Sequence, residues 1–294
     1  EVDIPLIIKD RLIGVFSVQH HEKNAFDQER IQLLESLAAH IAIAIENARL
    51  FRNEKMERER ISNELKDARN IQLYLFPQKS PSVPGFKLSG ICLPCLEAGG
   101  DWFDYITFED GKVGIVLADV SGKGMGAALL MSSTRSILRL VALKDVSPDE
   151  VLKKVNELLI KDFPTARFVT MIYAVLDPIN KTITMANAGH MYPIHKSSEG
   201  VKLLESKSGL PLGITHSTYD MIKLDLHSGD KLMFYTDGVT EAMDRSNEDF
   251  GIDKLFDIVK KEHLTVNDVV HSIEEFAAGT AQSDDITVVM IDAE

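Results

Sequence analysis

The amino-acid sequence predicts an α+β fold, a sandwich of antiparallel sheets whose helices come in separate pairs. Strand-like runs follow one another directly, as in 167–177 and 181–189, which Asp177-Pro178-Ile179-Asn180 joins with a strong turn pattern. Helical patterns are gathered in pairs instead of alternating with single strands, which argues against a parallel sheet. These patterns cover 125–143, 148–161, 252–261 and 266–278.

The first eighty residues predict a hairpin followed by one long helix or by two nearly continuous ones. Two β-rich runs within 4–19 flank the polar turn Lys9-Asp10-Arg11. Helical periodicity begins at Asp27, a suitable N-cap, and continues to residue 76, where Pro77 ends it. Apolar residues in the first half of this helix alternate between spacings of three and four, which is a heptad seam. They are Ile31, Leu34, Ala38, Ile41, Ile45 and Ala48.

The seam is interrupted within 52–60 and resumes out of phase at Ile61. The interruption is interpreted as a solvated linker, although a seam with two registers could also act as a switch. A helix of this length cannot bury its apolar stripe alone. We therefore expect a partner helix, most simply that of a second copy in a homodimer, to cover the stripe.

The predicted sandwich begins after a Pro- and Ser-rich boundary at 77–86. Ser147 and Pro148 suit the cap and the first turn of the helix that they open. The other strand-like runs are 86–95, 102–108, 112–119, 217–226, 230–236 and 286–292. The domains predicted from these changes of pattern are 1–50, a helical linker at 51–80, and 81–294.

Composition and charge narrow the classes of function. Hydrophobic residues make up 45% and charged residues 26%, as in ordinary soluble globular proteins. The net charge of −13 makes the chain a poor generic binder of nucleic acid or anionic membrane. No apolar run could cross a bilayer, and residues 1–18 alternate like strands rather than like a signal peptide. Cys92 and Cys95 make no disulfide framework, so we expect a cytoplasmic protein.

Acidic residues stand at the ends of four predicted strands. For any single one of them, a role in a turn is the ordinary interpretation. Four such sites, three of them beside glycine, instead predict a cluster whose mutual repulsion a divalent cation would relieve. The residues are Asp101, Asp119, Asp237, and the pair Asp284 and Asp285.

The segment GIVLADVSGKGMGAALL at 114–130 could serve as a phosphate cradle or as part of a metal site. It lacks the spacing of the nucleotide-binding glycine motifs. Its small residues instead allow a sharp turn that brings a main-chain carbonyl, that of Val120, close to a metal. The candidate ligands are all oxygen atoms, which selects Mg²⁺ or Mn²⁺ over zinc. Lys123 could steer an anionic substrate, or it could be a solvated lysine in a turn.

Several separate motifs resemble the SpoIIE-type phosphatases, the bacterial branch of the metal-dependent PPM serine/threonine phosphatases. The likeness spans about 67–292 and implies an αββα sandwich, in which helix pairs flank two antiparallel sheets. ARNIQLYLFP resembles the segment that leads into such domains. The motifs are, in order, GGDWFDY, ADVSGKGMGAAL, FVTMIYAVLDP, NAGH, PLG, YTDGVTEA and SDDITVV.

The N-terminal part resembles the closing strands and last helix of a GAF sensor domain, through IPLIIKD, GVFSVQ and LLESLAAHIAIAIENARLF. Only about the last fifty residues of such a domain match, within 1–50. A GAF ligand pocket needs the remainder of the domain. The resemblance therefore implies a partial GAF hairpin that binds no GAF ligand, followed by a coiled-coil linker helix.

The resemblance to the phosphatases also implies a reaction. Phosphoserine or phosphothreonine would be hydrolysed by a water that bridges two Mn²⁺ or Mg²⁺ ions. Asp119 resembles the carboxylate that bridges both metals, with the carbonyl of Val120 beside it. Asp237 resembles a ligand of one metal, and Asp284 matches the acid of the final motif. These three aspartates are the predicted catalytic carboxylates.

Two further acids are implied as metal ligands. Asp101 resembles the acid that reaches a metal directly or through water. Asp285 follows Asp284, and a shift of one residue in the match to the final motif would exchange their roles. The implied substrate is a phosphorylated regulatory protein, a STAS-type anti-anti-sigma factor, and the long helix would pass a signal to the site.

Two other classes of function stay open. One is a catalytically degenerate phosphatase fold that serves in binding or dimerisation, against which the intact set of acids argues. The other is a nucleotide cyclase or related metal-dependent enzyme, against which the missing nucleotide loop argues. A metal titration separates the first from the phosphatase, and turnover of a nucleotide would indicate the second.

The remaining candidate residues are given structural interpretations. His190 of NAGH is interpreted as a hydrogen-bonding residue, and Asp104 as an acid that hydrogen-bonds nearby. Arg167 is expected to be an exposed cation. Cys92 and Cys95 are expected to be small core residues of a strand, because a zinc site would need a second pair of ligands. The sequence identifies no general acid and no phosphate-binding arginine.

Overall fold

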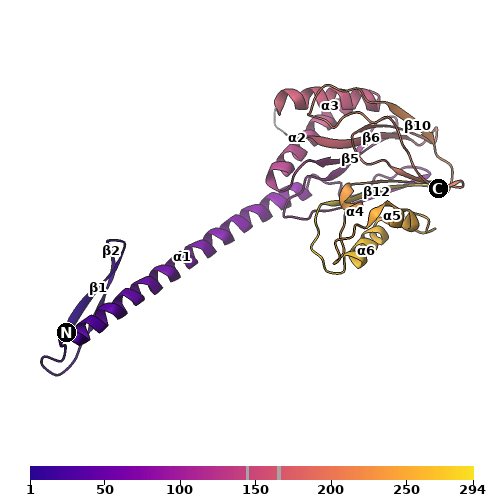
Figure 1. Cartoon of the computed structure of the whole chain (residues 1–294). Coiled ribbons are helices and arrows are strands. Elements are labelled where there is room, and N and C mark those ends of the chain that lie inside the picture. Colours follow the sequence, from indigo (N-terminus) through magenta and orange to yellow (C-terminus); the bar gives the residue numbers. More distant parts are fainter. Residues whose placement is uncertain (144–145, 164–166) are drawn as a thin grey trace. The chain divides into compact units, whose positions relative to one another are not determined.

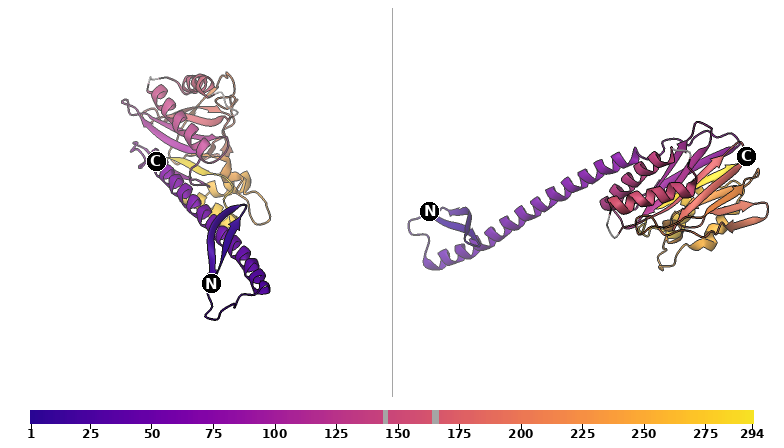
Figure 2. Two further views of the ribbon diagram at one scale, coloured as in Figure 1. Left: turned by 90° about the vertical axis from the view of Figure 1, so that its left-hand side faces the viewer. Right: turned by 90° about the horizontal axis from the view of Figure 1, so that it is seen from above.

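The computed structural model describes residues 1–143, 146–163 and 167–294. The chain divides into two compact units, 1–64 and 65–294, and the division falls within helix α1 (Gln28–Leu73). Figure 1 labels the elements, and Figure 2 shows them from two other directions. Among the described residues, no helix is both long enough and apolar enough to cross a membrane.

The first unit contains the predicted hairpin and the start of the predicted helix. β1 (Val2–Ile8) and β2 (Arg11–Val18) pair antiparallel around Lys9-Asp10. The φ angles of these two turn residues are 47° and 65°, which suits a tight hairpin turn. Asp27 caps α1 as predicted, since its Oδ1 accepts a hydrogen bond of 2.9 Å from the Arg30 N–H.

The hairpin covers part of the heptad seam of α1. Ile4 and Leu6 of β1 pack against the buried Ala38 and Ala42, with Leu34 at the edge of this small core. A two-stranded sheet needs such a partner to bury its apolar face. Elsewhere α1 exposes apolar side chains, namely Leu33, Leu37, Ile43, Ile45, Leu50, Phe51, Met56, Ile61, Ile71 and Leu73.

The second unit begins in α1 and holds all the other elements. Its strands are β3 (Phe86–Leu93), β4 (Trp102–Thr107), β5 (Val113–Val120), β6 (Val169–Asp177), β7 (Thr182–Ala188), β8 (Ile194–Ser197), β9 (Gly200–Leu203), β10 (Met221–Asp225), β11 (Lys231–Tyr235) and β12 (Ile286–Ala293). Its helices are α2 (Met125–Ala142), α3 (Pro148–Asp162), α4 (Asp237–Thr240), α5 (Gly251–Val259) and α6 (Val266–Ala277).

This unit confirms the predicted αββα sandwich. One sheet has the strand order β10-β7-β6-β5-β4, and the other has the order β3-β12-β11-β8-β9. Every neighbouring pair of strands is antiparallel. Helices α2 and α3 cover the first sheet, and α5 and α6 cover the second (Figure 1).

Three apolar layers hold the sandwich together, one between the sheets and one under each helix pair. Strand β5 contributes to two of them because its side chains alternate between its faces. Val113, Ile115 and Leu117 belong to the layer between the sheets. Val116 and Ala118 belong to the layer beneath α2 and α3. A strand buried on both faces holds Asp119, its penultimate residue, in a fixed position.

The structure also contains elements that the sequence analysis did not predict. The hairpin of β8 and β9 has strands of only four residues, too short for alternation of apolar and polar residues to be recognised. Helix α4 is a single turn. In addition, β3 ends at Leu93 rather than at residue 95, so Cys95 lies in the loop that follows.

Candidate metal centre

The aspartates singled out in the sequence come together where four strand ends meet. Asp119 is the penultimate residue of β5, and Asp101 directly precedes the neighbouring strand β4. Asp237 follows β11, and the pair Asp284 and Asp285 precedes β12, which is the neighbour of β11. The two sheets of the sandwich therefore each contribute part of the cluster.

The carboxylates are close enough to alter one another's ionisation. Burial, and next the charge of Asp237, raises the pKa of Asp119 to about 6. Burial and the charge of Asp284 raise the pKa of Asp237. Asp101 is 2% exposed, and burial followed by the charges of Asp119 and Asp285 raises its pKa well above the ordinary value. These aspartates form an anionic cluster that favours a bound cation.

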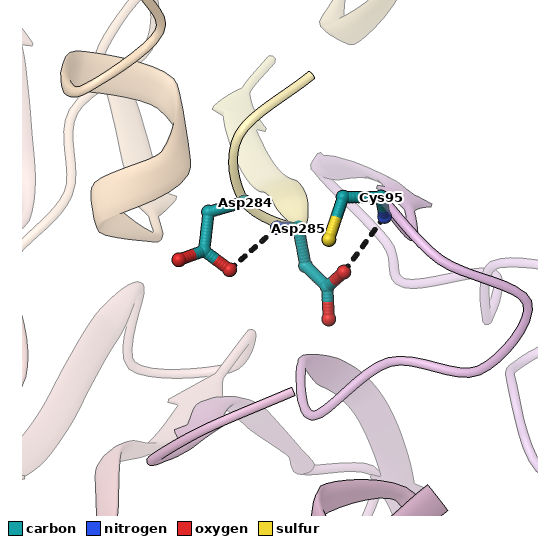
Figure 3. Close-up of side chains that lie close together, drawn as sticks. All are labelled: Cys95, Asp284 and Asp285. Atoms are coloured by element: carbon teal, nitrogen blue, oxygen red, sulfur yellow. Dashed lines mark hydrogen bonds between the residues drawn. The ribbon is translucent and has the colours of Figure 1, made fainter. Parts of the chain in front are cut away.

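Asp285 fastens the loop between β3 and β4 to the start of β12 (Figure 3). Its Oδ1 accepts a hydrogen bond of 2.8 Å from the Cys95 N–H. Its Oδ2 accepts hydrogen bonds from the N–H groups of Gly100, at 2.8 Å, and Asp101, at 3.3 Å. Because both oxygens of this buried carboxylate bind backbone amides, Asp285 fixes the loop that carries Asp101.

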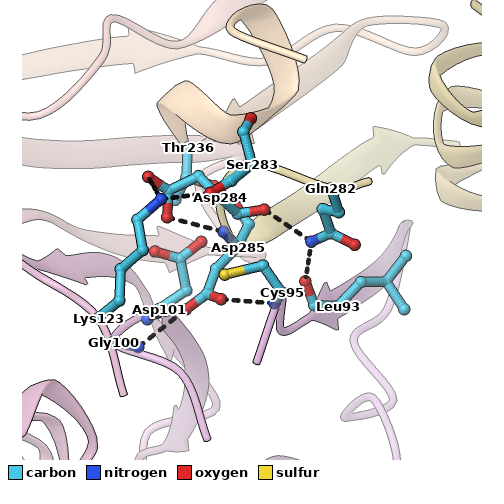
Figure 4. Close-up of polar contacts among 10 residues, drawn as sticks. All are labelled: Leu93, Cys95, Gly100, Asp101, Lys123, Thr236, Gln282, Ser283, Asp284 and Asp285. Atoms are coloured by element: carbon cyan, nitrogen blue, oxygen red, sulfur yellow. Dashed lines mark hydrogen bonds and ion pairs between the residues drawn. The ribbon is translucent and has the colours of Figure 1, made fainter. Parts of the chain in front are cut away.

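The side chain of Asp284 points away from the loop that Asp285 binds, and it is more exposed to solvent than that of Asp285 (Figure 4). Its side chain is 37% exposed, and its Oδ2 forms an ion pair of 2.9 Å with the Lys123 Nζ. Its Oδ1 accepts a hydrogen bond of 2.9 Å from the Asp285 N–H. Lys123 also donates a hydrogen bond to the Ser283 carbonyl. Of the two adjacent acids, Asp284 is therefore the one with an oxygen directed at a cation.

Two buried threonines support Asp101. The Thr287 hydroxyl donates a hydrogen bond of 2.7 Å to the Asp101 Oδ2. The Thr287 N–H in turn donates one of 3.0 Å to the Thr236 Oγ1. The sequence analysis missed both residues. Their signal is a hydroxyl on an otherwise apolar strand, close in sequence to Asp237 or Asp285.

Three glycines beside the acids lie so close to other atoms that a side chain in their place would clash. A Cβ on Gly100 would lie 2.8 Å from the Val120 carbonyl oxygen, and one on Gly99 would lie 2.3 Å from the Asp285 Oδ2. A Cβ on Gly238 would lie 2.0 Å from the Asp285 carbonyl oxygen. Real Cβ atoms do not approach other atoms so closely. The glycine-rich surroundings of the predicted acids therefore reflect the packing of these loops.

Gln72, in the last turn of α1, binds the same loop. Its Nε2 donates a hydrogen bond of 2.7 Å to the Gly99 carbonyl, and its Oε1 accepts one of 3.2 Å from the Gly99 N–H. The side chain is 5% exposed. The seam that resumes at Ile61 reaches Gln72 at spacings of three and four residues, but the sequence analysis gave Gln72 no role. A polar residue at a seam position was the available signal.

His190 and Asp104 have the structural surroundings that were expected. The Nδ1 of the buried His190 lies 2.7 Å from the Thr170 Oγ1, and burial lowers its pKa to about 4. Asp104 is 1% exposed and binds two arginines of α2. Its Oδ2 lies 3.0 Å from the Arg135 Nε and accepts a hydrogen bond of 2.6 Å from the Arg139 Nε.

Two other structural expectations were wrong. Arg167 is half-buried, not an exposed cation, and its guanidinium lies close to Gly122 and Gly126: a Cβ on Gly126 would lie 2.9 Å from the Arg167 Nη2. Cys95 is not a core residue of a strand, because β3 ends two residues earlier. Its Sγ lies within 4.8 Å of carboxylate oxygens of Asp284 and Asp285.

Solved structures identify the class of the sandwich. The SiaA-PP2C domain of Pseudomonas aeruginosa superposes with a TM-score of 0.72 at 20% identity, over 81% of this chain and 99% of that domain. RsbX in complex with magnesium superposes with a TM-score of 0.57 at 16% identity, over 74% of this chain and 99% of RsbX. The fold is that of the PP2C-like phosphatases.

Sequence comparison then gives the family. The chain belongs to the SpoIIE family, described as Stage II sporulation protein E, which matches residues 109–294. The GAF domain family matches residues 3–46. Both resemblances found in the sequence are thereby confirmed. The phosphoserine phosphatase RsbU of Bacillus subtilis (strain 168) is 31% identical over 188 residues, covering 63% of this chain and 55% of RsbU. The chain spans about half the length of the curated relatives it matches.

Proposed function

We propose that this chain hydrolyses phosphoserine or phosphothreonine on a regulatory phosphoprotein in bacterial signalling, with the help of two Mn²⁺ or Mg²⁺ ions. The observation that carries this proposal is the convergence of Asp119, Asp237 and Asp284 from strand ends in two different sheets. Membership of the SpoIIE family and the likeness to the phosphoserine phosphatase RsbU support the same reaction.

The residues present fit a pair of hard cations. Asp119, Asp237 and Asp284 are all partly accessible and offer carboxylate oxygens, the ligand type that Mg²⁺ and Mn²⁺ prefer. Burial and the neighbouring carboxylates raise the pKa values of Asp119 and Asp237, so a cation bound between them would relieve an unfavourable concentration of negative charge. RsbX, which shares the fold, has been solved in complex with magnesium.

Each acid would have a separate part in holding the cations. Asp119 and the neighbouring Val120 carbonyl would hold the ions from one sheet, while Asp237 and Asp284 would hold them from the other. Asp101 would bind directly or through water, held by Thr287. When bound, two divalent cations supply a water of lowered pKa and neutralise charge on phosphoryl oxygens. Asp285 would act by fixing the loop, because its oxygens are already bound to backbone amides.

The substrate that we propose is a phosphorylated STAS-type anti-anti-sigma factor. The SpoIIE family and the likeness to the phosphoserine phosphatase RsbU support a phosphoprotein substrate, and the motif resemblance is the ground for choosing the STAS-type class. Purified protein with Mn²⁺ should release phosphate from such a phosphoprotein, and Asp119→Asn should not. Asp110→Asn, a change of an exposed acid in the β4–β5 turn, serves as the control and should keep full activity.

A metal titration of the same variants tests the non-enzymatic alternative. Calorimetric titration should show binding of Mn²⁺ to the unchanged protein and a loss of that binding in Asp119→Asn. Absence of binding at millimolar Mn²⁺ would favour a degenerate fold that serves only in association. Phosphate release that survives both chelation and Asp119→Asn would refute the metal mechanism.

We further propose that α1 pairs with the same helix of a second copy and controls the site. The exposed apolar side chains of α1, among them Leu50 and Phe51, are the surface for this pairing. The bonds between Gln72 and Gly99 connect the end of α1 to the loop that Asp285 fixes. Light scattering should give a dimer for the unchanged chain and a monomer for Phe51→Glu. A monomer in both cases would contradict the pairing.

A further inference from the structure

Lys123 is the cation paired with the acidic cluster among the residues that the structure describes. Its Nζ lies 2.9 Å from the Asp284 Oδ2, and it also donates a hydrogen bond to the Ser283 carbonyl (Figure 4). Neither Asp119 nor Asp237 forms an ion pair with a described lysine, arginine or histidine. A single ammonium group therefore offsets part of the charge of the cluster, and it does so on the outward-facing acid.

The contact uses the same carboxylate that a divalent cation would use. An ammonium group and a divalent ion repel each other, and both are attracted to the oxygens of Asp284. Binding of the cation at Asp284 therefore has to break or weaken the ion pair with Lys123. The side chains of Lys123 and Asp284 are 44% and 37% exposed, so solvent already weakens the pair.

The conformation of the loop around Lys123 places the ammonium group beside Asp284, and the flexible side chain allows the group to move away. Gly122 and Gly124 flank Lys123 and have φ angles of 88° and 73°, which favour glycine. They turn the chain between β5 and α2 so that the lysine side chain crosses to Ser283 and Asp284, which belong to the segment before β12. The long aliphatic stem of lysine can then carry the charge into solvent without a change in the backbone.

We propose that Lys123 is a built-in competitor of the divalent cation for Asp284, and that it lowers the affinity of the site until the cation displaces it. This inference rests on the proposed function, because it assumes that Asp284 binds a cation. Lys123 would thus set the concentration of Mn²⁺ or Mg²⁺ at which the site fills. Lys123 would affect the cation through its ion pair with Asp284 and would not bind the cation itself.

Calorimetric titration of the metal-free full chain with Mn²⁺ tests the proposal. Lys123→Gln should bind Mn²⁺ about three- to tenfold more tightly than the unchanged protein, because the competing charge is gone. Lys123→Arg keeps the charge and should bind as the unchanged protein does. Lys87→Gln removes an equal charge at the far end of β3. It is the control for the effect of net charge alone on Mn²⁺ affinity. Equal gains in Lys123→Gln and Lys87→Gln, or no gain in Lys123→Gln, would overturn the proposal.

A second measurement follows the ammonium group itself. The ¹H–¹⁵N signal of the Lys123 side chain, assigned from its loss in Lys123→Gln, should shift when diamagnetic Mg²⁺ is added. A signal that stays in place while Mg²⁺ binds would show that the ion pair survives and would overturn the proposal. Absence of any cation binding would instead refute the proposed function, so the two failures are distinguishable.

Discussion

The buried carboxylate of Asp104 provides a direct test of how the domain is held together. Asp104 lies in β4 and is 1% exposed, and it binds Arg135 and Arg139 of α2 with three contacts of 2.6 to 3.0 Å. Asp104→Asn removes the charge and leaves two guanidinium groups with one neutral partner. Breaking a buried pair in this way costs 3–5 kcal/mol in general.

The lower end of this range applies, because the side chain of Arg139 is 42% exposed and can return to water. We expect the free energy of unfolding to fall by about 3 kcal/mol in Asp104→Asn. For a domain of this size the melting temperature should fall by about 6 to 12 °C. Asp257→Asn is the matched control, because its pair with Lys260 is largely exposed and should contribute less than about 1 kcal/mol.

Urea denaturation followed by tryptophan fluorescence is a suitable assay. The chain has a single tryptophan, Trp102, which is 1% exposed and lies in β4 two residues before Asp104. The midpoint should fall in Asp104→Asn and hardly move in Asp257→Asn, with equal slopes in both. A loss in Asp104→Asn no larger than in the control would refute the reasoning, since the ion pairs would then contribute no more than surface contacts.

Two further predictions concern the metal centre. Gln72→Ala leaves the N–H and the carbonyl of Gly99 without hydrogen-bond partners, at a cost of about 1–3 kcal/mol each. The loop that carries Asp101 should then be held less firmly, and Mn²⁺ binding in a calorimetric titration should weaken. Ile71→Ala changes an exposed neighbour and should leave Mn²⁺ binding unchanged. The pKa of Asp119 in the fold is raised to about 6, above the ordinary 3.8. The negative charge of Asp119 therefore destabilises the metal-free fold at pH 7.5, and this destabilisation disappears as the carboxylate is protonated below pH 6. Asp119→Asn should therefore melt higher than the unchanged protein in chelator at pH 7.5, and the gain should shrink towards pH 5; a constant gain would contradict this.

Much of the sandwich could be predicted because its strands and helices are long and strongly patterned. The run from Val113 to Val120 is apolar almost throughout, since β5 is buried on both faces. The turn at Lys9-Asp10 and the cap at Asp27 carry local signals that need no tertiary context. The short hairpin of β8 and β9 has no such signal, because β8 is stabilised by pairing with β11, and β9 by pairing with β8, rather than by a sequence pattern of their own.

The acids of the site could be found in the sequence, but their supporting contacts could not. Glycine neighbours and strand ends mark Asp101 and Asp119 locally. The difference between Asp284 and Asp285 depends on which one faces the loop between β3 and β4, and that loop lies almost two hundred residues earlier in the chain. Local sequence contains no record of such a contact. A polar residue at a seam position marked Gln72 locally, but its partner Gly99 belongs to another element and could not be inferred from that signal.

The division of the acids between two sheets makes the centre mechanically sensitive. Asp119 moves with the sheet that contains β5, whereas Asp237 and Asp284 move with the sheet that contains β11 and β12. A sliding of one sheet over the other by a fraction of an ångström would change the spacing of all three carboxylates together. A molecule that binds only one of the two sheets, even far from the carboxylates, could therefore change the spacing between them.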